Sequence, residues 1–261
     1  MKTAAIIQAR MGSTRLPNKV LMPVLGKPLL GWMLDRVSIC PEVNDIIVAT
    51  TTDPRDDVIA RFAEAEGYKV YRGSEEDVLD RYYQAACLVM PDAIARITAD
   101  CPVLDPAVLG SLILQFEALG IDFLSNSEPL PSSWPDGMDV SIVGFPALQK
   151  AWQQAVKHSD REHVTFFFWN NPQSFSCKRI DHTPDWSRYR VTIDYPEDFE
   201  LLKAVIEHFG SAGTPAAMHA SMEEIVAFLD ANPAVFDLNE KYTRGLGWTA
   251  ALERDKQLGF D

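Results

Sequence analysis

Short apolar runs alternate with amphipathic segments along the first 125 residues of this chain, and this alternation constrains the fold more than any other feature. The apolar runs have the length of buried strands, and helix-length segments follow them. The predicted strands occupy residues 4–8, 46–50, 68–71, 93–98 and 121–124. The predicted helices occupy residues 28–38, Asp53-Pro54 to about 65, 77–89, and a segment that opens at Asp105-Pro106. Such a series predicts βαβ units, and therefore an α/β fold with a mostly parallel sheet.

The alternation breaks after residue 126, where residues 128–137 are rich in proline and serine and predict a loop. The later predictions are a strand at 138–143, a helix at 145–156, an irregular aromatic segment at 162–180, a strand at 189–193, and helices at 196–209 and 221–231. We therefore expect one domain over residues 1–210, with halves 1–125 and 126–190. A C-terminal helix and tail would follow at 211–261, and the tail, 232–261, would wrap a surface or a partner.

Charge and cysteine spacing exclude several classes of protein. The net charge of −13 argues against a partner that is nucleic acid, because a phosphate backbone requires a broad basic surface. The apolar runs are too short for a transmembrane helix and the N-terminus lacks the features of a signal peptide, so we expect a cytoplasmic protein with no membrane partner. The four cysteines, Cys40, Cys87, Cys101 and Cys177, are scattered and predict reduced thiols rather than disulfides or a zinc site.

One cationic stretch stands out in this acidic chain. Residues 1–34 contain five lysines and arginines and no acid, and the segment QARMGSTRLPNK at 8–19 directly follows the first predicted strand. Backbone N–H groups of small residues can approach phosphate oxygens there, and Arg10, Arg15 and Lys19 can add charge-assisted hydrogen bonds. The pattern is neither a Walker A loop nor a dinucleotide fingerprint. The alternative is an ordinary solvated loop.

Two aspartates follow predicted strands at the edge where ligands bind in parallel sheets. Asp100 comes after the fourth strand, and Asp194 comes after the strand predicted at 189–193. Mg²⁺ is commonly held by one or two carboxylates together with substrate phosphates. Aspartates before proline often cap helices instead, as we expect for Asp53 and Asp105. For Asp194 alone, the residues leave the capping and the metal-binding interpretations open.

Segment 6–30 resembles the N-terminal signature of the sugar cytidylyltransferases, which include the acylneuraminate and ketodeoxyoctonate cytidylyltransferases. The matching positions are Ala9, Arg10, Ser13, Arg15, Pro17 and Lys19. Further segments are similar to the spore coat polysaccharide biosynthesis protein F branch of that family. They lie at 49–51, 72–82, 96–102, 135–140 and 161–165.

This resemblance implies a three-layer α/β/α, Rossmann-like nucleotide-diphospho-sugar transferase fold with an irregular insertion for sugar binding and dimerisation. It implies transfer of CMP from CTP to a sugar hydroxyl with release of pyrophosphate, for surface polysaccharide biosynthesis, and an acidic nonulosonic-type sugar. It also implies a homodimer and Mg²⁺ on Asp100 and Asp194, which match the family's metal aspartates. Two alternatives stay open: a nucleotide-sugar-dependent glycosyltransferase, although its Asp-x-Asp motif is missing here, and a non-catalytic nucleotide-binding module.

The resemblance also assigns roles to further residues. The catalytic cations would be Arg10, Arg15 and Lys19. The nucleotide-binding residues would be Gln8, Ala9, Arg10, Met11, Gly12, Ser13, Thr50, Thr51, Arg72, Gly73 and Ser74. The residues that face the acceptor sugar would be Asp136, Asp139, Arg161, Glu162 and His163. Residues 50–51 and 72–74 could equally be turn residues with local hydrogen bonds, and His163 could be a structural histidine.

Overall fold

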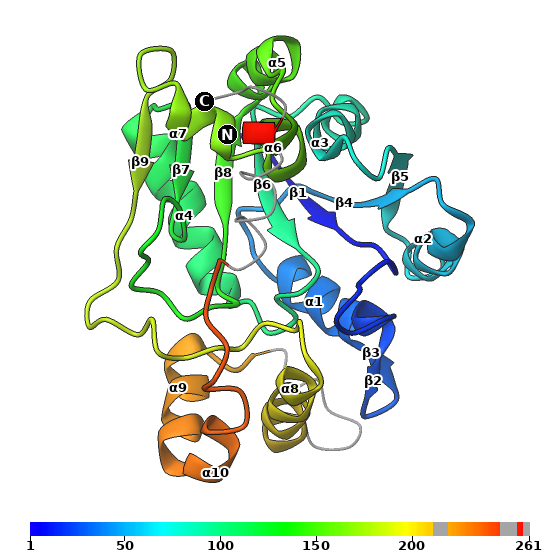
Figure 1. The fold of residues 1–261 in the computed structure, drawn as a ribbon, viewed down its shortest axis with the longest axis vertical. Helices are drawn as coiled ribbons and strands as arrows, with labels where there is room; N and C mark the ends of the chain where they lie inside the picture. Colours follow the sequence, from blue (N-terminus) through cyan, green and yellow to red (C-terminus); the bar gives the residue numbers. More distant parts are fainter. Residues whose placement is uncertain (211–218, 246–254, 258–261) are drawn as a thin grey trace.

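The computed structural model describes residues 1–210, 219–245 and 255–257, and these fold around a seven-stranded sheet of order β5-β4-β1-β6-β8-β7-β9 (Figure 1). Strand β8 is antiparallel to β6 and β7, and the other neighbouring pairs are parallel. The predicted mostly parallel sheet is therefore confirmed. The strands are β1 (Thr3–Gln8), β4 (Asp45–Thr51), β5 (Lys69–Gly73), β6 (Ala93–Thr98), β7 (Phe123–Ser125), β8 (Ser141–Gly144) and β9 (Cys177–Arg179). A separate hairpin pairs β2 (Pro23–Val24) with β3 (Lys27–Pro28).

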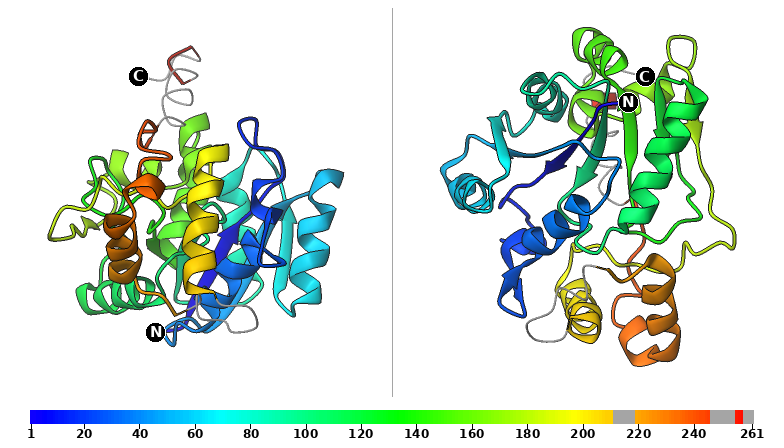
Figure 2. Two further views of the ribbon diagram at one scale, coloured as in Figure 1. Left: turned by 90° about the horizontal axis from the view of Figure 1, so that it is seen from below. Right: turned by 180° about the vertical axis from the view of Figure 1, so that it is seen from behind.

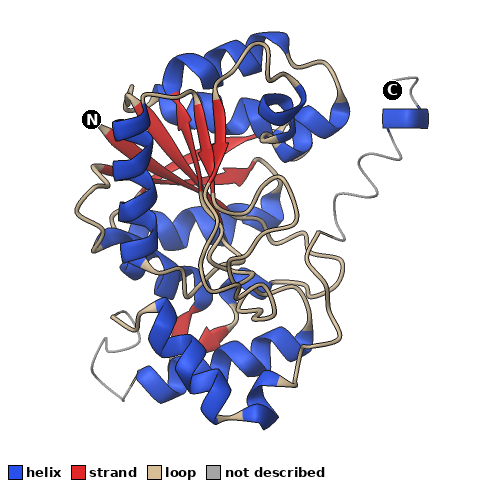
Figure 3. Cartoon of the chain, turned by 90° about the vertical axis from the view of Figure 1, so that its left-hand side faces the viewer, coloured by secondary structure: helices blue, strands red, loops and turns tan. Residues whose placement is uncertain are grey.

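Helices cover both faces of the sheet, which completes the predicted three layers (Figures 2 and 3). Ala5 and Ile7 of β1 belong to one apolar core, and Ile6 belongs to the other, because successive strand side chains point to opposite faces. The first core is built with α1 (Leu29–Ser38), α2 (Asp57–Ala65), α4 (Pro106–Leu119), α8 (Pro196–Phe209) and α9 (Met222–Ala231). The second is built with α3 (Val78–Cys87), α5 (Phe145–Gln154) and α7 (Phe166–Asn170). Three shorter helices are η1 (Lys19–Leu21), η2 (Pro54–Asp56) and α10 (Pro233–Phe236), and α6 (His158–His163) packs beside α3.

Side-chain caps begin several of these helices where the sequence predicts them. Asp53 accepts a hydrogen bond from the N–H of Arg55, and Asp105 accepts one from the N–H of Ala107. Both capping predictions are confirmed. These bonds satisfy N–H groups that have no partner in the first helical turn.

The strand predicted at residues 189–193 is wrong. The one pairing of this segment is an isolated bridge between Arg190 and Asp136. Near the end of the segment, the N–H of Ile193 donates to the carbonyl of Asp100 at 2.8 Å, in the loop after β6, and not to a neighbouring strand. An alternating apolar pattern predicts an extended backbone, but it does not predict which neighbour accepts the hydrogen bonds. The segment predicted to be irregular, 162–180, contains the end of α6, all of α7, and β9.

The aromatic residues of α7 serve the core of the chain. Phe166, Phe167 and Phe168 are all buried, and Phe168 stacks on Phe123 of β7 at 4.8 Å between ring centroids. They leave little exposed aromatic surface for a subunit interface, and the homodimer stays a prediction.

Within the described residues, no helix has the length and apolarity needed to cross a membrane. Much of the predicted tail lies outside the described residues, at 246–254 and 258–261, as does 211–218.

Gly137 allows two loops near the sheet edge to touch. Its φ of 110° is rarely adopted by other residues, and a Cβ there would lie 2.6 Å from the carbonyl carbon of Val191. We predict that Gly137→Ala lowers the free energy of unfolding by about 3 kcal/mol, because backbone strain and overpacking add. Gly120→Ala is the matched control: its φ is also positive, at 61°, but a Cβ there meets no atom within 4 Å.

The control should cost only about 1–2 kcal/mol, the penalty for a left-handed backbone. Urea unfolding of both variants gives the comparison. Equal losses in the two would contradict the close contact at Gly137.

Candidate active site

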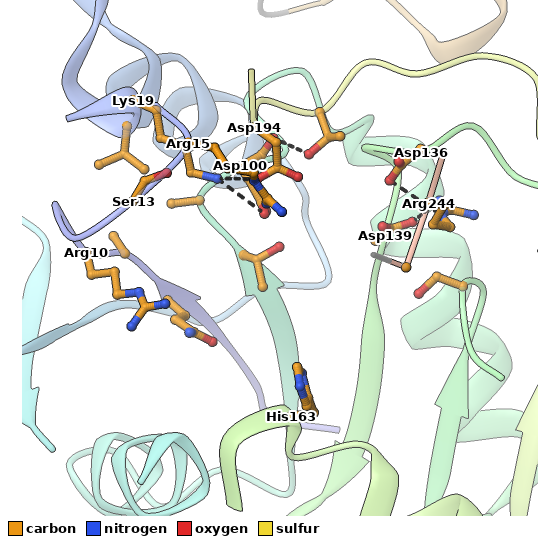
Figure 4. A pocket seen from close by; sticks show the side chains of 18 of the residues that line it. Arg10, Ser13, Arg15, Lys19, Asp100, Asp136, Asp139, His163, Asp194 and Arg244 are labelled. Atoms are coloured by element: carbon orange, nitrogen blue, oxygen red, sulfur yellow. Dashed lines mark hydrogen bonds and ion pairs between the residues drawn. The ribbon is translucent and has the colours of Figure 1, made fainter. Parts of the chain in front are cut away.

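A cavity of about 490 Å³ opens beyond the carboxyl ends of β1 and β6, where parallel sheets bind ligands (Figure 4). Loops from the irregular half of the chain close its other side. The cavity brings together most of the predicted site residues: Gln8, Ala9, Arg10, Gly12, Ser13, Arg15, Lys19, Asp100, Asp136, Asp139, Glu162, His163 and Asp194.

Lys19 joins the predicted phosphate segment to both predicted metal aspartates. Its Nζ lies 2.9 Å from Oδ1 of Asp194 and 3.8 Å from Oδ2 of Asp100. Arg15 contacts the same Asp194 oxygen at 2.6 Å. Burial acts to raise the pKa of Asp194, but the nearby Lys19 and Arg15 outweigh it and hold that pKa below its usual range. Two cations and two carboxylates, distant in sequence, thus form one cluster.

The backbone of the phosphate segment is partly engaged within the protein. The N–H of Met11 donates to Asp56 at 2.7 Å, and the N–H of Ser13 donates to the carbonyl of Met11 at 2.8 Å. Asp56 also accepts a hydrogen bond from the hydroxyl of Thr51. These N–H groups are therefore not free to cradle a phosphate, so the side chains of Arg10, Arg15 and Lys19 are the better candidates for that role.

A buried carboxylate holds the segment that carries Asp194. Oδ2 of Asp198 accepts the N–H groups of Asp194 and Tyr195 at 2.8 and 2.9 Å. Arg190 pairs with Asp198 at 2.9 Å, with Asp194 at 3.3 Å and with Asp136 at 2.5 Å. Arg190 therefore links Asp194 and Asp198 to Asp136, a residue predicted to face the acceptor sugar.

Asp100 and Asp194 fit a hard divalent cation in part. Both offer carboxylate oxygens to the cavity, with side chains 30% and 20% exposed. No third metal-binding side chain joins them within the described part of the chain. A site of this kind suits Mg²⁺, which usually takes one or two carboxylates and completes its shell with phosphates and water.

The predicted residues around β4 and β5 lie apart from the cavity. Thr50 and Thr51 are buried, and Arg72 donates to the carbonyls of Thr51 and Asp53 at 2.9 and 3.0 Å. Gly73 ends β5, and Ser74 accepts a hydrogen bond from the N–H of Asp77 at 3.0 Å. Their role in binding the nucleotide stays a prediction.

Arg161 also lies apart from the cavity. Its guanidinium forms a forked pair with Asp77, at 2.6 Å between Nη2 and Oδ2. Asp77 is the N-cap of α3, so this pair ties α6 to the start of α3. The geometry supports a structural role for Arg161, and its contact with an acceptor sugar stays a prediction.

Residues 4–230 match the family model described as Cytidylyltransferase. The chain belongs to the cytidylyltransferase family. It is 34% identical over 242 residues to an uncharacterized protein of Methanocaldococcus jannaschii, covering 92% of this chain and 95% of that protein. It is 33% identical to the spore coat polysaccharide biosynthesis protein SpsF of Bacillus subtilis, covering 87% of this chain and 94% of that one.

Solved structures agree with this assignment. A cytidylyltransferase from Leptospira borgpetersenii superposes with a TM-score of 0.83 at 33% identity, covering 90% of this chain and 97% of that one. A CMP:2-keto-3-deoxy-manno-octonic acid synthetase complexed with CTP superposes with a TM-score of 0.60 at 18% identity, covering 80% and 99%, and supports the fold alone.

The sequence did not predict several residues that line the cavity of this chain: Arg96, Ser127, Glu128, Ser141, Arg190, Thr192, Tyr195 and Arg244. One signal was available for Arg96, which is a cation inside the otherwise apolar strand at 93–98. A charge in a buried strand is rare without a partner or a ligand. Arg190 carries the same signal, as the cation inside the strand predicted at 189–193, whereas Arg244 carries none.

His163 lies at the end of the cavity remote from Lys19 (Figure 4). Burial lowers the pKa of His163 to about 4, and the positive charge of Arg96 acts in the same direction. We predict a neutral ring whose NMR signals do not titrate between pH 5 and 8.

The unfolded chain binds this proton near pH 6.5 and the folded chain only near pH 4, so His163 should lower stability as the pH falls between those values. A midpoint near 6.5 for the His163 ring would contradict the burial argument.

Proposed function

We propose that this chain transfers CMP from CTP to a hydroxyl of an acidic, nonulosonic-type sugar and releases pyrophosphate. The observation that carries the proposal is the cluster of Lys19 and Arg15 with Asp100 and Asp194 at the edge of the sheet. Nucleotidyl transfer requires cations for the triphosphate and carboxylates for its metal, side by side. The similarity to a spore coat polysaccharide biosynthesis protein supports a role in surface polysaccharide synthesis.

In the proposed reaction the sugar oxygen forms a bond to the α-phosphorus and the hydroxyl proton is lost to water. The bond between the α-phosphorus and pyrophosphate breaks, and its electron pair leaves on the pyrophosphate. Arg10, Arg15 and Lys19 would bind the phosphates and offset that developing charge. Asp100 and Asp194 would hold Mg²⁺, which when bound neutralises phosphate charge. The protein otherwise positions the two substrates, and this accounts for much of such catalysis.

An acidic acceptor is supported by the state of Arg96. Its Nε is buried and has no hydrogen-bond partner, and its guanidinium lies 5.7 Å from the centroid of the Tyr82 ring. Two other arginines that line the cavity, Arg190 and Arg244, are paired with aspartates. Arg96 is therefore the cation best placed to receive a sugar carboxylate.

The direct test is pyrophosphate release with Mg²⁺, in which CTP, UTP, GTP and ATP are each paired with a panel of nonulosonic and neutral sugars. We expect release with CTP and an acidic sugar, and loss of release when Mg²⁺ is chelated. Release with neutral sugars alone would overturn the acceptor assignment. Tight CTP binding without release from any pair would favour the nucleotide-binding module, and use of a CMP-sugar donor would favour a glycosyltransferase.

Lys19 should be needed for turnover. We predict that Lys19→Ala lowers kcat by about 10²–10³, by analogy with the loss of one preorganised donor to a developing charge. Lys2→Ala is the control, because Lys2 precedes β1 at the end of the strand remote from the cavity. Equal kcat values in the two variants, measured by pyrophosphate release, would remove Lys19 from the mechanism.

Arg96 should select for the acceptor's charge. We predict that Arg96→Gln raises KM for an acidic sugar about 10–100-fold, the equivalent of one charge-assisted hydrogen bond. KM for CTP should change little, because Arg96 lies at the acceptor end. A rise in KM for CTP alone, in steady-state kinetics, would place Arg96 on the nucleotide instead.

A further inference from the structure

Residues 239–245, here called the C-terminal strap, lie beyond the family match at 4–230 but contribute to the cavity wall. Thr243, Arg244 and Gly245 line the cavity directly. The strap follows α10 and is attached to the site through three side chains. Asn239 and Arg244 contact aspartates, and Tyr242 contacts Tyr195 and Glu197.

The first attachment is Asn239, which is 2% exposed. Its side-chain N–H group donates to Oδ1 of Asp198 at 2.8 Å and to the carbonyl of Arg190 at 3.1 Å. Asp198 is the carboxylate that holds the backbone of Asp194. The strap therefore reaches the residue that sets the position of a proposed metal ligand.

The second attachment is Tyr242. Its ring stacks on that of Tyr195, with centroids 3.7 Å apart and planes 2° from parallel. Its hydroxyl donates to Glu197 at 2.9 Å. Tyr195 follows Asp194 and faces the guanidinium of Arg15 at 5.1 Å. The strap thus packs against Tyr195, the residue that lies between Asp194 and the start of α8.

The third attachment is Arg244, whose side chain is 16% exposed. It donates to the carbonyls of Trp134 and Pro135 at 3.3 and 3.0 Å, pairs with Asp139, and lies 3.3 Å from Asp136. Asp136 also forms an ion pair with a second cation, Arg190. Among the described residues, Arg244 is the only ion-pair partner of Asp139.

We propose that residues 243–245 of the C-terminal strap are part of the acceptor subsite, and that Arg244 is a positioning residue that holds Asp139 toward the acceptor sugar. The geometry of Figure 4 places Arg244, Asp136 and Asp139 together on the side of the cavity away from Arg10. Two carboxylates so close to one another repel unless a cation lies between them, and Arg244 supplies that cation from outside the family's common segment. This inference rests on the proposed function, because it assigns the acceptor to this side.

The test compares Arg244→Ala with Lys241→Ala. Lys241 is on the same strap, but it makes an exposed pair with Glu197, 61% and 33% exposed, and such pairs contribute little. We expect Arg244→Ala to raise KM for the acceptor sugar at least 10-fold, with the Kd for CTP within 2-fold of the parent, and Lys241→Ala to change neither. Added guanidinium ion should restore part of the Arg244→Ala loss, which a merely misfolded variant would not show.

Arg244→Lys keeps the charge but not the forked geometry, so it should be intermediate in acceptor KM. Equal weakening of CTP binding and acceptor binding, or no kinetic change at all, would overturn the proposal.

Calorimetry of sugar binding separates this inference from the proposed function. A parent chain that binds an acidic sugar and releases no pyrophosphate would refute the transfer reaction, whereas Arg244→Ala that binds the sugar as the parent does would refute the strap's role. Absence of sugar binding to the parent would refute both.

Discussion

The ammonium group of Lys19, placed between Asp100 and Asp194, is the interaction on which the rest of the site depends. The two carboxylates come from a loop after β6 and from the segment before α8, and neither would be stable beside the other without a cation. Lys19 also donates to the carbonyl of Ile193 at 2.7 Å. One side chain from the N-terminal loop thus fixes both the charge balance and the position of a segment late in the chain.

A second cation, Arg190, extends this arrangement to Asp136. It is paired with three aspartates, and desolvation alone would lower its pKa, but Asp198 and its other partners raise that pKa above its normal value. Opposite charges alternate from Arg15 through Asp194 and Arg190 to Asp136 and Arg244. This series of alternating charges allows many charged side chains to lie near one cavity, because each charge in the series has a partner of opposite sign.

Local signals in the sequence predicted the elements that hold the site, and they failed where pairing is long-range. The strand that ends at Gln8 and the strand that precedes Asp100 were predicted from apolar runs. The caps at Asp53 and Asp105 were predicted from an aspartate before proline. The segment 189–193 was predicted as a strand because its apolar residues alternate along the sequence. Its hydrogen bonds go to the loops at Asp136 and Asp100, and no periodic pattern records such partners.

The sequence by itself determined the order of strands and helices, the cationic segment after β1, and the family to which its motifs are similar. These features depend on residues that are neighbours along the chain. Only the tertiary structure decided which charges meet: Arg161 pairs with Asp77 away from the cavity, while Arg96 and Arg244 line it. The reason is physical, because an ion pair depends on distance through space and on the burial of both groups, and a folded chain sets both by packing.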